Sequence, residues 1–381
     1  MSTSSRPSPL VAERKQHPFL TYDMIYEIPE AIERTIQACT PRMESIAGRL
    51  EGKSHFYFTG CGTAFFSATL GSNIFSLSGA DAPGFEAVQA LELTNHHRVA
   101  ANSAAFGVSH SGITKTTLDA LRKSKSAGGY TVGITHFADS PISRVADETL
   151  VVGNSPDKSR CHTKCYLTGA LPITILGASL LERQNASDPE RLRKIRSELG
   201  ELPHLAKKVL TSADLVIKEL AEKNAFKRTF YFAGSGASYP NAVEAALKIM
   251  ETSYVPAQGF ETEQLLHGPW ASLDNDSVVF VMATENRTHS RSIDLVKAAA
   301  NLGSTVVLLT YEGDREIDSV GNIGIELPMV DEQLAPFLSI IPLYLFAYYT
   351  AVKRGHNPDY LRYLTPTYWD ARTIIFPAGT H

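Results

Sequence analysis

Three charged residues share one face of a predicted helix. Glu244, Lys248 and Glu251 follow one another at spacings of four and three residues, in a segment (241–251) rich in strong helix formers. A carboxylate beside an ammonium group can move a proton next to a carbonyl, because the cation offsets the charge that develops there. His267 begins a Gly-Pro turn further on, and imidazole is a common general acid or base. These residues suit proton transfer, although a solvated helix face and a structural histidine explain the same pattern.

Two other segments carry glycine and hydroxyl residues in a pattern that suits an anion. Residues 59–63 (Thr-Gly-Cys-Gly-Thr) and 109–114 (Ser-His-Ser-Gly-Ile-Thr) each follow a predicted strand and open a predicted helix. Backbone N–H groups and the helix dipole attract negative charge at such a position. A tight turn without a ligand explains the first segment equally well. In the second, capping by one serine explains one hydroxyl, whereas Ser109, Ser111 and Thr114 together predict a phosphate site.

The sequence predicts neither a cofactor nor a metal ion. A dinucleotide fingerprint needs glycine or alanine where this chain has Phe65 and, in a second similar segment, Tyr239. Cys161 and Cys165 flank His162, but these three residues lack the second pair of ligands that a zinc site needs.

The chain contains an internal repeat. Residues 56–62 (FYFTGCG) reappear as residues 230–236 (FYFAGSG), an offset of 174. The same offset relates residues 104–109 to 278–283 and residues 130–134 to 304–308. We therefore expect two copies of one domain: an N-terminal extension over residues 1–40, a first domain over 41–200, and a second domain with a C-terminal tail over 201–381.

Each copy alternates short apolar runs with helical patterns. This alternation predicts the α/β class, with a parallel sheet covered by helices on both faces in a three-layer sandwich. In such sheets, ligands bind beyond the carboxyl ends of the strands. Segments 59–63 and 109–114 follow strands, so we expect them to meet at that edge.

Composition limits the classes of partner. Thirty-six Lys and Arg residues against forty Asp and Glu give a net charge of −4, which disfavours nucleic acid as a partner. Four cysteines suit a reducing cytoplasm, and residues 1–17 lack the apolar core of a signal peptide. The run Leu334–Val352 approaches the length of a membrane span. Its two prolines and the lack of a second such run favour a buried core helix over a membrane span, so no membrane is expected as a partner.

Taken together, these motifs resemble the tandem SIS (sugar isomerase) family. The resemblance rests on residues 60–63, 109–114, 162–164, 244–251 and 266–269. The chain looks like the isomerase half of glucosamine-6-phosphate synthase without its glutaminase domain. Amino-sugar-phosphate isomerase/deaminases and fructosamine-6-phosphate deglycases share that layout. Residues 334–337 and 356–359 resemble the deglycase branch in particular.

The resemblance implies roles for individual residues. Glu251 would be the general base that moves a proton between C1 and C2, with Lys248 beside it. His267 would assist ring opening, and in relatives it can come from a neighbouring subunit, so a homodimer or higher homo-oligomer is expected. Asp157 falls where the synthase places a sugar-contacting acid. The residues expected to bind the substrate are Gly62, Thr63, Ser109, His110, Ser111, Thr114 and Asp157.

Several positions depart from the synthase pattern. Ala64 replaces a hydroxyl residue, His110 stands where synthases carry glutamine, and no lysine follows Lys353. Transfer of ammonia from glutamine is therefore not expected. We predict a cofactor-free isomerase, deaminase or deglycase of an amino-substituted sugar 6-phosphate acting through an enediol or enolamine. The alternatives are an isomerase of a non-amino sugar phosphate or sulfo-sugar, and a non-catalytic regulator that binds a sugar phosphate.

Overall fold

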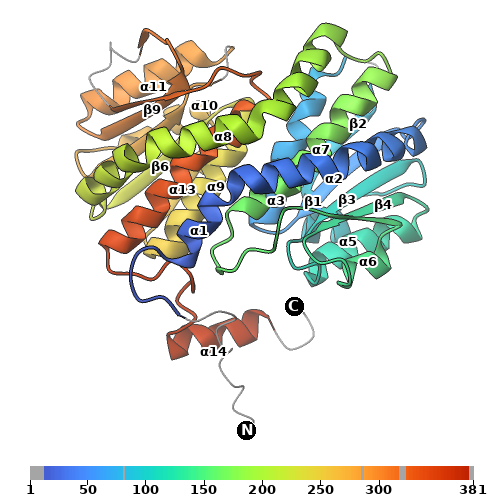
Figure 1. Ribbon diagram of the computed structural model, residues 1–381, viewed down its shortest axis with the longest axis horizontal. Coiled ribbons are helices and arrows are strands. Elements are labelled where there is room, and N and C mark those ends of the chain that lie inside the picture. Colours follow the sequence, from blue (N-terminus) through green and yellow to red (C-terminus); the bar gives the residue numbers. More distant parts are fainter. Residues whose placement is uncertain (1–12, 80–81, 285–286, 317–322, 377–381) are drawn as a thin grey trace.

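The computed structural model describes residues 13–79, 82–284, 287–316 and 323–376 (Figure 1). Two five-stranded parallel sheets lie side by side in it. The first sheet consists of β1 (His55–Gly60), β2 (Gly84–Gln89), β3 (Ser103–Val108), β4 (Tyr130–Thr135) and β5 (Glu148–Val151). The second consists of β6 (Thr229–Gly234), β7 (Ala257–Phe260), β8 (Ser277–Met282), β9 (Thr305–Tyr311) and β10 (Ile323–Leu327).

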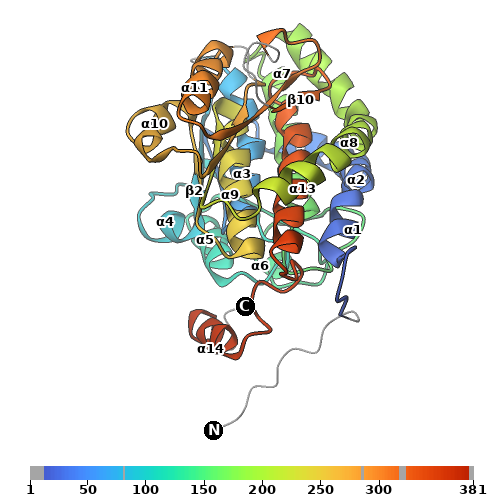
Figure 2. The same ribbon diagram turned by 90° about the vertical axis from the view of Figure 1, so that its left-hand side faces the viewer.

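Helices cover both faces of each sheet. The first half of the chain contains α1 (Leu20–Tyr26), α2 (Ile28–Arg49), α3 (Thr63–Ser72), η1 (Asn73–Leu77), α4 (Ala90–Asn95), α5 (Lys115–Ser126), α6 (Ile142–Val145) and α7 (Lys164–Arg183). The second half contains α8 (Pro189–Asn224), η2 (Gly236–Ser238), α9 (Tyr239–Ser253), α10 (Thr262–Leu266), η3 (Pro269–Ser272), α11 (His289–Asn301), α13 (Ala335–Lys353) and α14 (Pro366–Ile375). Figure 2 shows α4, α10 and α11 on one side of the molecule and α1, α2 and α8 on the other.

The two sheets have the same strand order. The first runs β2-β1-β3-β4-β5, and the second, read from its other edge, runs β7-β6-β8-β9-β10. The two copies of the repeated run lie in β1 and β6, which pair with β3 and β8 respectively. The order reverses between β1 and β3, and in open α/β sheets ligands bind at that position. The α/β three-layer class predicted from the sequence is confirmed, and the two loops predicted to bind an anion flank this switch point.

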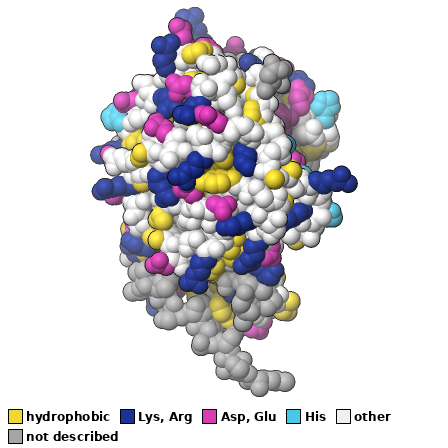
Figure 3. All heavy atoms as spheres, turned by 90° about the vertical axis from the view of Figure 1, so that its right-hand side faces the viewer, with side chains coloured by type: hydrophobic (Ala, Val, Ile, Leu, Met, Phe, Trp, Pro, Cys, Tyr) yellow, Lys and Arg dark blue, Asp and Glu magenta, His cyan; other side chains and the backbone are white. Residues whose placement is uncertain are grey.

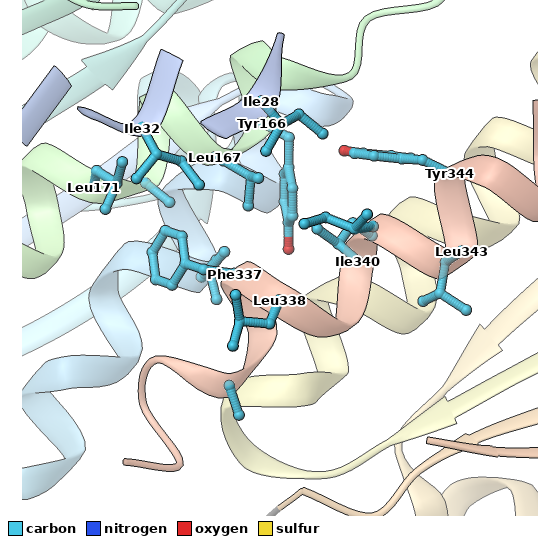
Figure 4. Close-up of a cluster of buried hydrophobic side chains, with 14 of the residues drawn as sticks. Ile28, Ile32, Tyr166, Leu167, Leu171, Phe337, Leu338, Ile340, Leu343 and Tyr344 are labelled. Carbon is cyan, nitrogen blue, oxygen red and sulfur yellow. The ribbon is translucent and has the colours of Figure 1, made fainter. Parts of the chain in front are cut away.

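Two almost wholly apolar helices form the centre of the molecule. Both α7 and α13 are long and apolar enough to cross a membrane. However, 94% of the most apolar 18-residue stretch in each helix is buried inside the protein. The run predicted as a core helix lies in α13, and α7 is a second such run that the sequence was expected to lack. The side chains that meet between them include Tyr166, Leu167 and Leu171 from α7 and Phe337, Leu338 and Ile340 from α13 (Figure 4).

Both predicted domain boundaries fall inside helices. Residue 40 lies within α2, and residue 200 lies within α8. α2 packs against α7 and α8, and α8 packs against α13, so both helices span elements of the two halves. The placement of the boundaries therefore stays a prediction.

Surface charge is mixed. On the face shown in Figure 3, Lys and Arg side chains are interspersed with Asp and Glu side chains. Many of the ion pairs are exposed pairs of this kind, such as Arg183 with Glu51 and Lys208 with Glu312. Each such pair contributes little to stability, because solvent screens the two charges.

A buried carboxylate joins the beginning of the described chain to its end. Asp359 accepts hydrogen bonds from the backbone N–H groups of Leu20 (3.0 Å) and Thr21 (2.8 Å) and from the Thr21 hydroxyl (2.8 Å). The side chain is 1% exposed, and its own backbone carbonyl accepts from the N–H of Arg160. Asp359 therefore holds α1, the loop before α7 and the C-terminal tail together.

We expect Asp359→Ala to lower the free energy of unfolding by about 2–4 kcal/mol, because it leaves buried backbone donors without an acceptor. Urea unfolding followed by circular dichroism measures this change. Asp370→Ala, which removes an exposed carboxylate from α14, is the matched control. Equal stability of the two variants would contradict the role assigned to Asp359.

Candidate active site

One cavity of about 330 Å³ lies at the switch point of the first sheet. Its walls come from the loop after β1, the loop after β3, the end of β4 and the loop before α7, with α9 of the second half closing it. Of the predicted site residues, those that line it are Gly62, Thr63, His110, Ser111, Thr114, Lys248 and Glu251.

The cavity floor holds a buried network centred on Lys248. The ammonium group of Lys248 lies 2.6 Å from Glu251 Oε2, 3.4 Å from Glu244 Oε1 and 3.0 Å from Thr63 Oγ1. Thr63 in turn donates to Glu244 at 3.0 Å, and so does the hydroxyl of Tyr344 at 3.1 Å. The helical spacing of α9 brings the three charged side chains together, and Thr63 ties them to the loop of the first half.

Exposure differs sharply between the two carboxylates of this network. The side chain of Glu244 is 0% exposed and that of Lys248 is 1% exposed, whereas Glu251 is 24% exposed and reaches the cavity. Burial raises the pKa of Glu244 to about 7, against the opposing effect of the Lys248 charge. The neighbouring carboxylates hold the pKa of Lys248 well above its usual value despite burial. Lys248 is therefore a fixed cation, and Glu251 is the carboxylate that a ligand can touch.

The two loops predicted to bind an anion depend on two glycines with left-handed backbone. Gly62 has φ +57° and precedes the first turn of α3, with open space where a side chain would stand. Gly112 has φ +67°, and a Cβ there would lie 2.0 Å from Ser140 Oγ. Thr114 is the residue before α5 and its side chain does not cap that helix, so its hydroxyl lies at the helix N-terminus beside the cavity.

Three predicted residues lie outside the cavity wall. Ser109 is 1% exposed, and its hydroxyl bonds to Thr114 Oγ1 and the Gly112 N–H, so it shapes the loop from behind. Asp157 accepts from the backbone N–H groups of Thr163 and Cys165. His267 is exposed and lies 3.1 Å from Glu263, away from the cavity.

Several cavity residues escaped prediction. His136 follows β4, and the rule that ligands bind at strand ends was sufficient to find it. Arg160 lies in an irregular loop, and Arg372 lies in α14, where the sequence carries no signal. Lys164, which belongs to a motif used for the resemblance, points away and pairs with Glu27 instead.

Part of the cavity is closed by the C-terminal tail. The tail residues at the cavity are Leu361, Tyr363, Arg372 and Phe376, and the helix α14 that carries Arg372 lies below both sheets in Figure 1. The guanidinium of Arg372 lies over the rings of Tyr363, Trp369 and Phe376. These cation–π contacts hold the tail segment together at the cavity mouth.

Imidazole groups form another part of the cavity wall. The rings of His110 and His136 are joined by a 3.0 Å contact between their Nδ1 atoms, and the His110 ring lies edge-on to that of His162. Burial lowers the pKa of all three histidines. Burial also raises the pKa of the adjacent Cys165 thiol. The wall is therefore neutral, in contrast to the charged floor.

The fold and this cavity define a class: a tandem α/β protein whose glycine- and hydroxyl-rich loops come from one copy and whose Lys248–Glu251 pair comes from the other. The chain belongs to the SIS domain family, since the family's model matches residues 49–173 and 225–354.

Two relatives with assigned names align with most of this chain. Glutamine–fructose-6-phosphate aminotransferase [isomerizing] of Pyrococcus horikoshii is 31% identical over 349 residues, which cover 92% of this chain and 57% of that protein. The enzyme of the same name from Thermococcus kodakarensis is 29% identical over 350 residues, which cover 92% of this chain and 58% of that protein. The chain thus spans less than two thirds of the length of these relatives.

Solved structures share the fold. The C-terminal domain of glucosamine-fructose-6-phosphate aminotransferase from Francisella tularensis superposes with a TM-score of 0.80 at 24% identity, covering 92% of this chain and all of that one. Glucosamine-6-phosphate deaminase from Thermotoga maritima superposes with a TM-score of 0.73 at 21% identity. The superposition covers 89% of this chain and 96% of that one.

We expect Glu244→Gln to change how stability depends on pH. The pKa of Glu244 is about 7 in the folded chain and near 4.5 in the unfolded chain, so between these values only the folded state keeps the proton. The stability that this carboxyl contributes is complete below pH 4.5 and is lost as pH rises through 7. The loss is about 3 kcal/mol at 1.36 kcal/mol per pKa unit.

Urea unfolding at several pH values measures this effect. The free energy of unfolding of the wild type minus that of Glu244→Gln should fall as pH rises from 4.5 to 7.5. Glu219→Gln, at an exposed position of α8, is the matched control for loss of one carboxylate. A difference that does not vary with pH would refute the raised pKa.

Proposed function

We propose that the protein is an aldose–ketose isomerase of an amino-substituted sugar 6-phosphate, of the kind represented by glucosamine 6-phosphate and fructosamine 6-phosphate. The observation that carries this proposal is the position of Glu251 and Lys248 in the same cavity as Thr63, Ser111 and Thr114. Membership of the SIS domain family, and relatives named as isomerizing aminotransferases of fructose 6-phosphate, support it.

The phosphate is held by the loops of the first sheet. Gly62 and Thr63 provide the first loop, and Ser111 and Thr114 the second, with the N-termini of α3 and α5 directed toward the anion. Ala64 supplies no hydroxyl, so the second loop supplies most of the side-chain donors. Ser109 keeps the second loop in shape through its bond to Thr114.

Glu251 transfers the proton. In the ketose-to-aldose direction it removes a proton from C1, and the electron pair forms the C1–C2 double bond of an enediol or enolamine. The same carboxyl then returns the proton to C2. Lys248, 2.6 Å from Glu251, offsets negative charge as it develops on the intermediate. Glu244 and Thr63 fix the position of Lys248.

A substrate with nitrogen at C1 or C2 opens a second outcome. Hydrolysis of the imine form of the same intermediate releases ammonia or an amino acid, which makes deamination and deglycation branches of one mechanism. Arg160 and Arg372 favour the deglycase branch, because both residues line the cavity and a guanidinium group suits a carboxylate carried by the sugar's nitrogen. Isomerisation of a non-amino sugar phosphate or sulfo-sugar uses the same base without this step.

A non-catalytic sugar-phosphate regulator is the alternative from another class. A sensor needs the phosphate loops but no base, and Glu251 is the partly exposed carboxylate at the cavity. Catalysis is therefore the stronger hypothesis. A cytoplasmic homodimer or higher homo-oligomer, with no nucleic acid or membrane as partner, completes the proposal.

We expect Glu251→Gln to lower turnover by roughly 10²–10⁴-fold, the usual contribution of a general base. The measurement is deuterium incorporation at C1 or C2, followed by NMR, with fructose 6-phosphate and fructosamine 6-phosphate in deuterated water. Glu219→Gln is the matched control. A folded Glu251→Gln variant with near-wild-type exchange would remove Glu251 from the mechanism, and wild-type protein that binds these sugars without exchange would be a sensor.

His267 is expected to act in the cavity of a neighbouring subunit, because it does not line the cavity of its own chain. His267→Ala and Glu251→Gln should each have only a small fraction of wild-type activity alone. When the two variants are mixed, unfolded and refolded together, the sample should regain roughly a quarter of wild-type activity. The reason is that half of the dimers contain one chain of each variant, and each such dimer has one intact site of two. Activity that stays absent in a mixture shown by mass spectrometry to contain mixed dimers would exclude catalysis in trans.

A further inference from the structure

Four metal-ligating side chains from three separate segments meet at one wall of the cavity. They are His110 from the loop after β3, Asp157 and His162 from the loop before α7, and Cys165 from the first turn of α7. One ligand atom of each lies within 4.8 Å of those of the other three. The sequence predicted no metal because Cys161 and Cys165 flank a single histidine. Folding supplies a second pair, His110 and Asp157.

From this cluster we infer a site for a borderline transition-metal ion of the Zn²⁺ type, with His110, Asp157, His162 and Cys165 as its ligands. Imidazole, thiolate and carboxylate together are a ligand set typical of zinc, whereas magnesium and calcium prefer oxygen alone. The site goes beyond the proposed isomerase activity and does not depend on it.

The distances suit a tetrahedral ion. Zinc bonds of about 2.0–2.3 Å place the ligand atoms of a tetrahedron roughly 3.3–3.8 Å apart. Cys165 Sγ and His162 Nδ1 are already 3.5 Å apart. The widest pair in the cluster needs to close by about 1 Å from its present limit of 4.8 Å.

An unpartnered carboxylate oxygen of Asp157 also supports a metal ion at this cluster. Asp157 Oδ2 accepts two backbone N–H groups, whereas Asp157 Oδ1 is buried with no hydrogen-bond partner among the residues that the structure describes. A buried carboxylate oxygen without a donor is costly, and a cation beside it removes that cost.

A chain of outer hydrogen bonds orients His110. One assignment of protons satisfies every contact: His110 Nδ1–H donates to His136 Nδ1 (3.0 Å), His136 Nε2–H to Thr168 Oγ1 (3.1 Å), and that hydroxyl to the backbone carbonyl of Cys165 (3.4 Å). This assignment leaves the lone pair of His110 Nε2 free for a metal. Such outer partners are how proteins fix the tautomer of a ligating histidine.

The ion has a route to the site, because His110, His162 and Cys165 all line the open cavity. Binding breaks the S–H bond of Cys165, forms a metal–sulfur bond and releases the proton to solvent. No electron is transferred. The site lies in the same cavity as Glu251, so an ion bound there would face the substrate.

Co²⁺ titration of chelator-treated protein tests this site without any substitution. We expect a tetrahedral Co²⁺ spectrum with a sulfur-to-cobalt charge-transfer band, saturating at one ion per chain and displaced by Zn²⁺. The absence of this band, or binding of Zn²⁺ that shows no saturation, would overturn the proposal.

Cysteine variants identify the sulfur ligand. Cys165→Ser should remove the charge-transfer band and weaken Zn²⁺ binding by more than about tenfold. Cys61→Ser is the matched control, because Cys61 also lines the cavity but lies outside the cluster, and it should keep both. Thermal unfolding shows that each variant is folded. The reverse result, loss of the band in Cys61→Ser and not in Cys165→Ser, would contradict the assignment.

Discussion

One buried ammonium group joins the two halves of this protein. Lys248 belongs to the second half, yet it shares its three donor directions among Glu244, Glu251 and Thr63, and Thr63 belongs to the first. A buried charge is tolerated only where partners surround it, so the position of α9 against the first sheet is fixed by electrostatics as well as by packing. The cavity exists because these two halves meet at this point.

Much of the fold was predictable from the sequence because its signals are local and repeated. Short apolar runs predicted strands, and the offset of 174 residues predicted duplication, which the matching strand orders of the two sheets confirm. Helical spacing alone placed Glu244, Lys248 and Glu251 on one face of α9. The boundaries of the domains were harder, because α2 and α8 continue across the predicted positions.

The rest of the site depends on long-range contacts that no spacing in the sequence records. The segment 161–165 gave no metal pattern by itself, since Asp157 and His110 reach it only through the folded loops. Ser109 matched the predicted motif, but its hydroxyl is used within the loop. His267 illustrates a further limit, because the role proposed for it in another subunit cannot be tested by the geometry of one chain.

The packing of α8 against α13 has a consequence for synthesis of the chain. α8 is complete by residue 224, but α13 begins at residue 335. A ribosome makes the intervening residues over several seconds or longer, at about 5–20 residues per second. During that interval the apolar side of α8 that packs against α13 is uncovered by that helix, so a chaperone can bind this surface until α13 emerges.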